Sequence, residues 1–216
     1  MTSNPRGKFI TFEGGEGVGK STNIHWCADW LTAQNIDVIV TREPGGTPIA
    51  ELIRNKLLKA HHAEPMVPMA ELLLMFAARA QHLEAVILPA LSQGTWVLCD
   101  RFTDSTIAYQ GFGRGLDLSS IETLKTLVQG TLEPDCTLLL DAPIEVGMAR
   151  AHGRSVATGE ATDRFEIEQL AFFERVRDGF QTLAATHSRF VTLDATQTLD
   201  DIQAELAIRL NLLRAP

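Results

Sequence analysis

One stretch near the start of the chain decides the fold. It reads Phe9-Ile10-Thr11-Phe12-Glu13-Gly14-Gly15-Glu16-Gly17-Val18-Gly19-Lys20-Ser21. The apolar beginning predicts a β-strand over 9–12, and residues 14–21 match the spacing G-x-x-x-x-G-K-S/T. Glycines let successive backbone N–H groups turn toward an anion, and the helix predicted at 20–34 directs its positive end to the same point. We therefore predict that residues 14–21, the phosphate loop, bind a nucleoside triphosphate.

Side chains in and near the phosphate loop have separate expected roles. Lys20 is expected to reach the β- and γ-phosphates of ATP, and the Ser21 hydroxyl to ligate Mg²⁺. Asp100 ends another apolar strand, as the metal-binding aspartate of such proteins does, and is the second expected Mg²⁺ residue. The residues expected to contact ATP are Gly14, Gly15, Glu16, Gly17, Val18, Gly19, Lys20, Ser21 and Thr22.

Apolar runs elsewhere in the chain predict a parallel sheet. Further strands are predicted over 37–41, 95–99, 136–140 and 189–193. These runs are continuous and not alternating, which indicates burial on both faces. Helices are predicted between them, at roughly 20–34, 47–59, 67–93, 103–110, 118–130, 143–152, 165–186 and 198–213. Strands interleaved with helices predict a doubly wound α/β fold with five parallel strands, in a single domain over 1–216.

Composition argues against two classes of partner. The net charge is −8 and the pI is about 5.2, whereas sequence-independent nucleic-acid binding depends on basic surfaces. No run approaches the roughly 20 uninterrupted apolar residues of a membrane helix, and the polar residues 1–8 predict no signal peptide. We expect a cytoplasmic protein without nucleic-acid or membrane partners. Its cysteines, Cys27, Cys99 and Cys136, are expected to be reduced, buried thiols.

Three more segments bring polar residues toward the carboxyl ends of strands, where open α/β sheets bind ligands. They are 41–47 (T-R-E-P-G-G-T), 74–82 (L-M-F-A-A-R-A-Q-H) and 100–111 (D-R-F-T-D-S-T-I-A-Y-Q-G). Together with the phosphate loop, these motifs closely resemble the bacterial thymidylate kinase family, nearly from end to end. The resemblance implies a P-loop nucleoside monophosphate kinase fold: a five-stranded parallel sheet with helices on both faces and a lid.

The resemblance also implies an activity, a cofactor and an assembly. The expected reaction moves the γ-phosphoryl group of ATP onto dTMP, giving dTDP and ADP on the route to dTTP. Mg²⁺ would accompany ATP, and the family is usually a homodimer. A kinase for another nucleotide or a deoxynucleoside is the first alternative. An ATP-dependent switch without a small acceptor is the second.

Roles in binding dTMP follow for matching positions. Glu16 is expected to meet the sugar 3′-hydroxyl, because a carboxylate among phosphate-binding amides would be repelled unless it faced the acceptor. Arg79 resembles the arginine that binds thymine, and its donors suit a carbonyl and a ring nitrogen. Arg101 resembles the arginine that holds the acceptor phosphate. The residues expected to contact dTMP are Glu16, Glu43, Pro44, Arg54, Met75, Phe76, Arg79, Arg101, Ser105, Thr106, Tyr109 and Gln110.

Several of these roles have open alternatives. The family's stacking aromatic lies four residues before the arginine, where this chain has Met75; Phe76 is preferred because a flat ring stacks better. Glu43 could instead help to position Mg²⁺. Arg42 and Arg54 are weaker candidates for holding the acceptor phosphate, and either could instead be a surface ion-pair residue. Tyr109 is expected beside the 2′ position of the sugar, and is otherwise a buried helix residue with a satisfied hydroxyl.

A lid is expected at about 150–164. Residues 152–162 are rich in Gly, Ser, Thr and Ala and fit neither helix nor strand, and such connections often cover active sites, although a surface insertion is the alternative. Phosphoryl transfer depends on neutralising charge, and the phosphate loop contains one cation. The resemblance therefore implies a lid arginine, Arg154 before Arg150 or Arg164. The expected catalytic residues are Lys20, Arg101 and Arg154.

Overall fold

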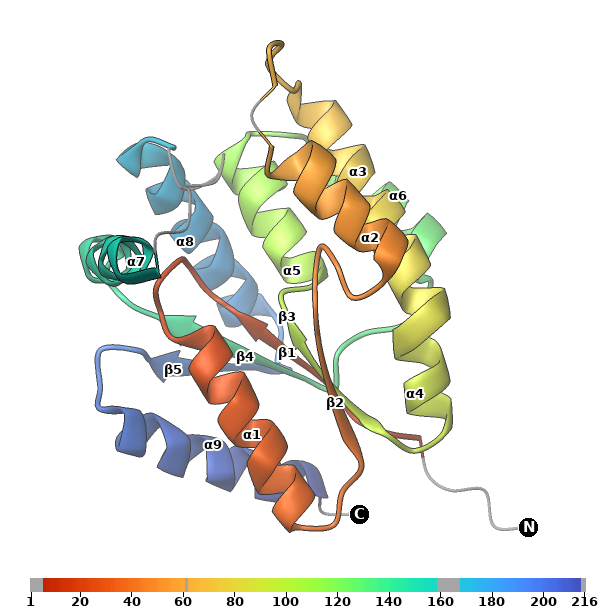
Figure 1. The fold of residues 1–216 in the computed structure, drawn as a ribbon, viewed down its shortest axis with the longest axis vertical. Helices are drawn as coiled ribbons and strands as arrows, with labels where there is room; N and C mark the ends of the chain where they lie inside the picture. Colours follow the sequence, from red (N-terminus) through yellow and green to blue (C-terminus); the bar gives the residue numbers. More distant parts are fainter. Residues whose placement is uncertain (1–5, 61, 159–167, 215–216) are drawn as a thin grey trace.

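Five parallel strands form a sheet with helices on both faces (Figure 1). The structure is a computed structural model that describes residues 6–60, 62–158 and 168–214. The strand order is β2-β3-β1-β4-β5, which places β1 at the centre. The strands are β1 (Phe9–Glu13), β2 (Val38–Arg42), β3 (Trp96–Asp100), β4 (Cys136–Asp141) and β5 (Phe190–Asp194). All five strand predictions are confirmed to within one residue at each end.

Helices fill the intervals between the strands, several of them with a π-helical continuation. They are α1 (Lys20–Ala33), α2 (Pro48–Leu52) with η1 (Ile53–Leu58), α3 (Pro68–His82) with η2 (Leu83–Ile87) and α4 (Leu88–Ser92), α5 (Thr103–Thr106) with η3 (Ile107–Gly113), α6 (Leu118–Gln129), α7 (Ile144–Thr158), α8 (Leu170–Thr186) and α9 (Leu199–Arg214). Each predicted helix has a counterpart in this set.

The start of the expected lid needs a correction. Residues 152–158 were predicted to be irregular, but they form the last turns of α7. Gly153 does not end the helix, because a single glycine costs only about 1 kcal/mol relative to alanine and no proline follows it. The rest of the expected lid, from residue 159, lies outside the described residues, as does the predicted start of α8 at residue 165.

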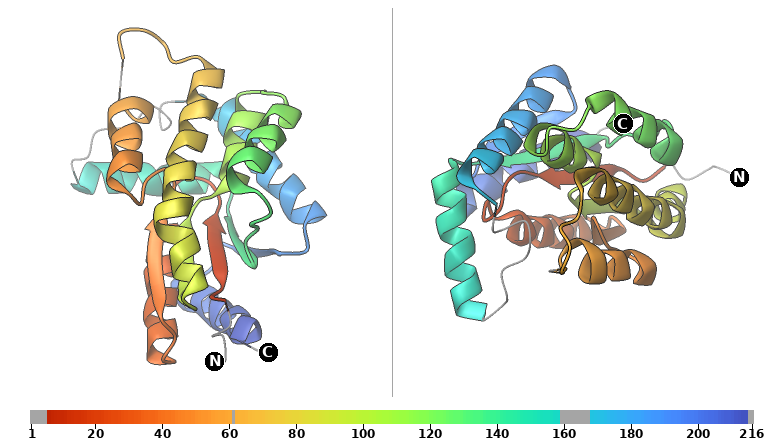
Figure 2. Two further views of the ribbon diagram at one scale, coloured as in Figure 1. Left: turned by 90° about the vertical axis from the view of Figure 1, so that its right-hand side faces the viewer. Right: turned by 90° about the horizontal axis from the view of Figure 1, so that it is seen from above.

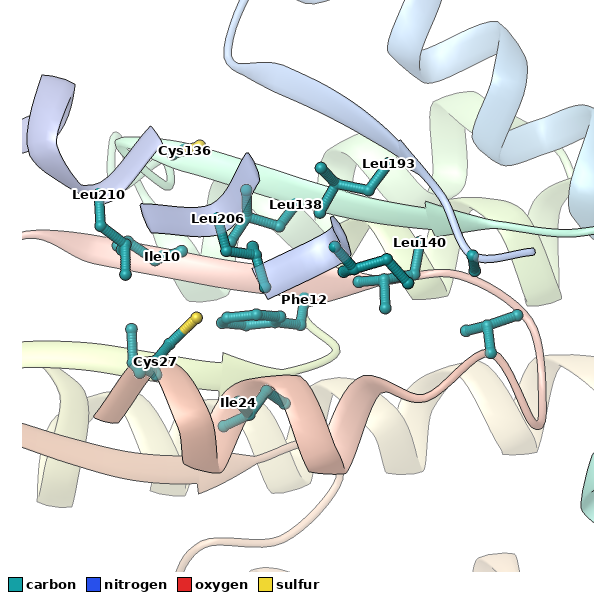
Figure 3. Packing of buried hydrophobic residues seen from close by; sticks show 14 of the residues in the cluster. Ile10, Phe12, Ile24, Cys27, Cys136, Leu138, Leu140, Leu193, Leu206 and Leu210 are labelled. Carbon is teal, nitrogen blue, oxygen red and sulfur yellow. The ribbon is translucent and has the colours of Figure 1, made fainter. Parts of the chain in front are cut away.

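Helices α1 and α9 cover one face of the sheet. Ile24 and Cys27 of α1 and Leu206 of α9 belong to one buried cluster with Ile10 and Phe12 of β1. Figure 3 shows these side chains meeting around the Phe12 ring. Because every residue of β1 is buried, this packing fixes the strand that leads into the phosphate loop.

The opposite face is covered by the long run from α3 to α4 and by α8. The first run packs Leu83 and Ile87 on Phe9 and Phe102, while α8 packs Phe180 on η3 and β4. The predicted state of the three cysteines is confirmed, since each is a buried free thiol. The run Pro68–Ser92 is long and apolar enough to cross a membrane by length and composition, and 39% of its most apolar window is buried inside the protein.

Helix α7 lies against the phosphate loop at the periphery of the molecule (Figures 1 and 2). The contact is made by backbone: a Cβ added to Gly147 would lie 2.5 Å from the carbonyl oxygen of Glu16. A Cβ added to Gly17 would lie 2.0 Å from the carbonyl oxygen of Gly147. Two glycines therefore let the helix and the loop approach more closely than side chains permit.

Gly147→Ala should disrupt this contact. The added methyl group has no flexible neighbour to displace, so we expect a loss of about 1–3 kcal/mol in the free energy of unfolding. It should also raise the KM for ATP, the nucleotide expected at the loop. Gly153→Ala, in the same helix but with open space around its Cβ, is the control and should leave stability equal or slightly higher. Urea unfolding of both variants measures the difference, and equal stabilities would contradict the contact.

Candidate active site

A cleft opens at the carboxyl ends of β1, β2 and β3, beside the phosphate loop. It encloses about 660 Å³ including its open mouth. We call it the acceptor cleft. It is lined by Glu16, Glu43, Pro44, Arg54, Leu58, Lys59, Met75, Arg79, Arg101, Phe102, Ser105, Thr106, Tyr109 and Gln110. The structure thus brings together every residue expected to contact dTMP except Phe76. Leu58, Lys59 and Phe102 were not predicted.

Arg79 is buried in the wall of the cleft, with its side chain only 3% exposed. Its Nε donates to Glu43 Oε2 at 2.7 Å and its Nη2 donates to Thr106 Oγ1 at 2.9 Å. Its Nη1 is buried and has no hydrogen-bond partner within the described part of the chain. A buried donor without a partner costs free energy, so this nitrogen is suited to an acceptor brought by a ligand.

The two candidates for stacking lie in different places. Met75 lines the acceptor cleft. Phe76 does not, because it packs in a buried cluster with Leu72 and Ile121, and its ring lies 4.7 Å from the Arg79 guanidinium. The preference for Phe76 as a stacking residue therefore needs correction: its position suits support of Arg79 from behind.

Arg101 joins the phosphate loop to the acceptor cleft. Its Nη1 donates to the Gly14 carbonyl oxygen at 2.9 Å and its Nη2 donates to Glu16 Oε1 at 2.8 Å. The same guanidinium donates to Ser105 Oγ and to the Tyr109 hydroxyl, both at 3.1 Å. Burial alone would lower the pKa of Arg101, but Tyr109 and the carboxylates around it raise that pKa above its usual value. The cation is permanent and is held at a fixed point.

Tyr109 is a buried helix residue with a satisfied hydroxyl, and it also lines the acceptor cleft. The side chain is buried, with its ring edge-on to Phe172 at a centroid distance of 6.0 Å. Its hydroxyl accepts from Arg101 and donates to Glu16 Oε1 at 3.2 Å. Burial raises the pKa of Tyr109 well above its usual value, so the hydroxyl stays protonated. The tyrosine therefore positions the Arg101–Glu16 pair while it lines the cleft.

Polar partners also fix the remaining wall residues. Gln110 Nε2 donates to Glu71 Oε1 at 2.8 Å, which orients the amide beside Arg79's end of the cleft. Arg54 Nη1 donates to the Pro44 carbonyl oxygen at 2.9 Å, and burial followed by the charge of Arg42 lowers its pKa. Arg42 itself pairs with Glu51 at the surface and is absent from the cleft wall. Of these two arginines, only Arg54 faces the cleft.

Lys20 folds back over the phosphate loop. Its Nζ donates to the carbonyl oxygens of Gly14 at 3.2 Å and Gly15 at 2.6 Å, and the residue is only 7% exposed. Burial, followed by the charge of Arg101, lowers the pKa of Lys20 to about 8. Ser21 and Thr22 are exposed at the start of α1. The loop therefore presents backbone amides, one amine and one hydroxyl to a bound anion.

Asp100 has the character expected of a residue that meets a metal ion. It ends β3, and its Oδ1 is buried without a hydrogen-bond partner in the portion the structure describes. Within the same portion, no group of three or more His, Cys, Asp or Glu side chains is arranged to hold a metal ion. A divalent ion at Asp100 would therefore need further oxygen ligands from a bound nucleotide and water, as Mg²⁺ sites commonly have.

Glu13 is a site residue that sequence reasoning missed. It ends β1 and is fully buried, accepting from Phe102 N at 2.8 Å and from Ser105 Oγ. Burial, and then the negative charge of Asp104, raise the pKa of Glu13 to about 8. The available signal was a carboxylate at the end of an otherwise apolar strand, where an uncompensated charge is costly.

The described part of the expected lid contributes one contact. Arg150 Nη1 donates to the carbonyl oxygen of Ala195 at 2.7 Å, which ties α7 to the segment after β5. Arg154 lies in the last turns of α7, but its side chain falls outside the described part, as does Arg164 entirely.

Comparison with known proteins decides the family. The family model described as thymidylate kinase matches residues 12–206. The chain belongs to the thymidylate kinase family. A thymidylate kinase from Chromohalobacter salexigens is 56% identical over 205 residues, covering 94% of this chain and 95% of the relative. One from Pseudomonas fluorescens strain SBW25 is 57% identical over 198 residues, covering 91% of each.

A solved structure agrees with the fold. The crystal structure of thymidylate kinase from Ehrlichia chaffeensis is 36% identical and superposes with a TM-score of 0.74. The match covers 95% of this chain and 99% of that one. The predicted family and the thymidylate kinase fold, a five-stranded parallel sheet covered by helices, are thereby confirmed.

The raised pKa of Glu13 predicts a pH-dependent stability. In the unfolded chain the carboxyl group ionises near 4.5, whereas in the folded protein it keeps its proton up to about 8. The folded state therefore binds more protons, and this group's contribution to stability is lost as the pH rises through that window. At roughly 1.4 kcal/mol per pKa unit, the loss is on the order of a few kcal/mol.

Glu13→Gln tests this prediction, since the amide fills the same space and cannot ionise. The variant should lose less unfolding free energy than the wild type between about pH 5 and pH 8, measured by urea unfolding at several pH values. Glu84→Gln, at an exposed carboxylate, is the control and should retain the wild-type slope. A Glu13→Gln slope equal to that of the wild type would show that Glu13 is already ionised.

Proposed function

We propose that this chain transfers the γ-phosphoryl group of ATP to dTMP, giving dTDP and ADP for dTTP synthesis. The observation that carries the proposal is Arg79 Nη1, an unpartnered buried donor in the wall of a cleft whose other end holds Arg101. A pyrimidine carbonyl would satisfy the first arginine, and a phosphate group the second. Thymidylate, the acceptor for which the family is named, carries both a pyrimidine carbonyl and a phosphate group.

The acceptor would lie with its base toward Arg79 and its phosphate toward Arg101. The Gln110 amide, oriented by Glu71, would meet the base beside Arg79, and Met75 would cover its face. Glu16 would accept from the 3′-hydroxyl, which places its charge on the acceptor side of the phosphate loop. Tyr109 and Ser105 would then line the sugar, and a tyrosine ring at the 2′ position leaves little room for a ribose hydroxyl.

ATP would bind along the phosphate loop. Backbone amides of 14–20 would hold the β-phosphate, and Lys20 would exchange its carbonyl partners for the β- and γ-phosphates. Kinases that use ATP generally need a divalent metal ion, and we propose Mg²⁺ held by the Ser21 hydroxyl and, directly or through water, by Asp100. Bound there, Mg²⁺ would supply neutralisation of charge on the β- and γ-phosphates.

Transfer in this arrangement needs little acid–base chemistry. The acceptor is already a phosphate anion, so the obstacle is repulsion between two anions. Arg101 contacts the phosphate loop directly through Gly14 and could neutralise the acceptor phosphate next to the γ-phosphate. Its fixed position avoids reorganisation during the reaction.

Assembly and location are also proposed. We propose a single-domain enzyme that forms a homodimer, supported by the exposed apolar side chains Ile49 and Leu52 on α2 and Met69 and Leu73 on α3. We propose a cytoplasmic enzyme without nucleic-acid or membrane partners. The net charge of −8 supports the absence of a nucleic-acid partner. The absence of a membrane partner is supported by Arg79, which lies on the apolar run from α3 to α4 and makes its polar contacts inside the protein.

An assay of ADP release tests the function. With ATP and Mg²⁺, we expect ADP release to depend on dTMP. Release should be slow with dCMP or dGMP, and with dUMP it should be intermediate or absent. Lys20→Ala should lower kcat by about 10²- to 10³-fold, while Lys56→Ala, at an exposed site, should not. ADP release that does not depend on any nucleotide acceptor would contradict a kinase, and a preference for dCMP or dGMP would contradict dTMP.

We propose further that Arg154 supplies a cation when the lid closes. The phosphate loop offers Lys20 alone, and Arg150 is bound to Ala195. Because such a cation favours the transition state, Arg154→Ala should lower kcat at saturating ATP and dTMP, by as much as 10³-fold for an arginine finger. Arg150→Ala should have a smaller effect and Arg164→Ala is measured beside it. If all three variants kept the wild-type kcat, the lid would only cover the site and would supply no catalytic cation.

A further inference from the structure

A fully buried histidine lies behind the base end of the acceptor cleft, outside the mechanism described above. His82 ends α3 and is 0% exposed. Its Nδ1 is 3.0 Å from Glu43 Oε1, and its Nε2 is 2.6 Å from Thr41 Oγ1. Both ring nitrogens are thus bound to the segment that follows β2. His82 is absent from the cleft wall, so any effect on a ligand must pass through a neighbour.

That neighbour is Glu43, which connects His82 to Arg79. One carboxylate oxygen meets His82, and the other accepts from Arg79 Nε at 2.7 Å. A carboxylate can only accept, so His82 Nδ1 must carry a proton here. The Thr41 hydroxyl lies against the other ring nitrogen, Nε2, so both nitrogens of the imidazole have a partner. Thr41, His82, Glu43 and Arg79 then form one continuous chain of hydrogen bonds.

Backbone geometry indicates that space for the imidazole is built into the segment after β2. A Cβ added to Gly46 would lie 2.4 Å from His82 Nε2 and 2.6 Å from Thr41 Oγ1, and Gly46 has a φ of 81°. Only glycine suits this position on both grounds. Thr41, Glu43 and Gly46 therefore all contact, or make room for, one histidine. On α3, Arg79 and His82 are three residues apart and share a helical face.

The chain of hydrogen bonds determines which guanidinium nitrogen faces the ligand. The Arg79 guanidinium contacts the faces of two rings, Phe76 and Phe102, at 4.7 and 5.1 Å from their centroids. These rings fix the plane of the guanidinium, but they do not fix its rotation within that plane. The Glu43 contact at Nε and the Thr106 contact at Nη2 do so, and they leave Nη1 as the guanidinium nitrogen without a hydrogen-bond partner in the described part of the chain.

We propose that His82 is a positioning residue for recognition of the acceptor base. It holds Glu43, and through Glu43 it fixes Arg79 Nη1 as a donor toward a ring carbonyl. His82 thereby sets the preference for a 4-oxo over a 4-amino pyrimidine. The 4-amino group of dCMP is a donor and would face Arg79 Nη1, a second donor whose direction is fixed. The 4-carbonyl of dTMP would instead accept from Nη1. This inference rests on the proposed function.

Steady-state kinetics of His82→Gln and His82→Asn test the proposal. The glutamine amide reaches toward Thr41 and loses the donor to Glu43, whereas the asparagine nitrogen lies near the position of Nδ1 and keeps it. We expect His82→Gln to raise the KM for dTMP on the order of tenfold and to narrow the dTMP-to-dCMP ratio of kcat/KM. The kcat and the KM for ATP should stay within about twofold, and His82→Asn should recover most of the loss.

A double-mutant cycle separates positioning from general loosening. Since His82 acts through Arg79, His82→Gln added to Arg79→Ala should change the KM for dTMP by less than about twofold. A full tenfold effect in that background would overturn the proposal, as would an unchanged dTMP-to-dCMP ratio in the single variant. So would parallel rises in both KM values.

Two further measurements keep the outcome decisive. Thr41→Val removes only the far hydrogen bond and should raise the KM for dTMP by a few fold, which tests the chain if His82→Gln does not fold. Binding of dTMP to the wild type is measured in parallel by calorimetric titration. Absence of dTMP binding would overturn the proposed function itself. Normal binding and selectivity, unaffected by His82→Gln and Thr41→Val, would overturn the role of His82 alone.

Discussion

The hydrogen bond from Arg101 to the Gly14 carbonyl oxygen is the contact on which the site depends. It exists because β1 and β3 are parallel neighbours with Phe12 opposite Asp100, so the segments that follow the two strands leave the sheet side by side. Arg101 adopts a φ of 68°, a left-handed conformation that is unfavourable for arginine. Buried contacts on either side hold it there: Arg101 N donates to Phe12 O, and Phe102 N donates to Glu13. Strand register thus sets the point at which the phosphate loop and the acceptor cleft meet.

Three buried carboxylates in the described part of the chain, each at or next to a residue of the acceptor cleft, pair with arginines. Arg79 pairs with Glu43, Arg114 with Glu71, and Arg189 with Asp104, each carboxylate being nearly inaccessible to water. Buried ion pairs contribute little net stability, because desolvation offsets most of their attraction. Their distribution is better explained by position. Glu43 orients Arg79, Glu71 orients Gln110, and Asp104 lies against Glu13, which binds the turn that carries Arg101. Apolar side chains in place of these ion pairs would stabilise the fold equally well. They would not orient Arg79, Gln110 or the turn that carries Arg101.

Sequence reasoning succeeded where a pattern has a local cause and failed where packing decides. Continuous apolar runs and the glycine spacing of the phosphate loop located all five strands and the loop, because both patterns follow from backbone geometry. The choice between Met75 and Phe76 was different. Adjacent helical residues point about 100° apart, and which of them faces the cleft depends on how α3 packs against Ile121 of α6, far away in the sequence. Glu13 was missed for the same reason, since its partners lie 89 and 92 residues away.

Two cations, Lys20 and Arg101, lie close together at the phosphate loop. Burial, and then the charge of the nearby Arg101, lower the pKa of Lys20 to about 8. Asp100 and Glu16 offset this repulsion only in part, since the negative charges raise the pKa of Lys20 less than burial and Arg101 lower it. A bound phosphate would supply the remaining negative charge, which favours the protonated amine and strengthens its own binding. A bound phosphate would therefore relieve the repulsion between Lys20 and Arg101, and the cations would not need to move for it.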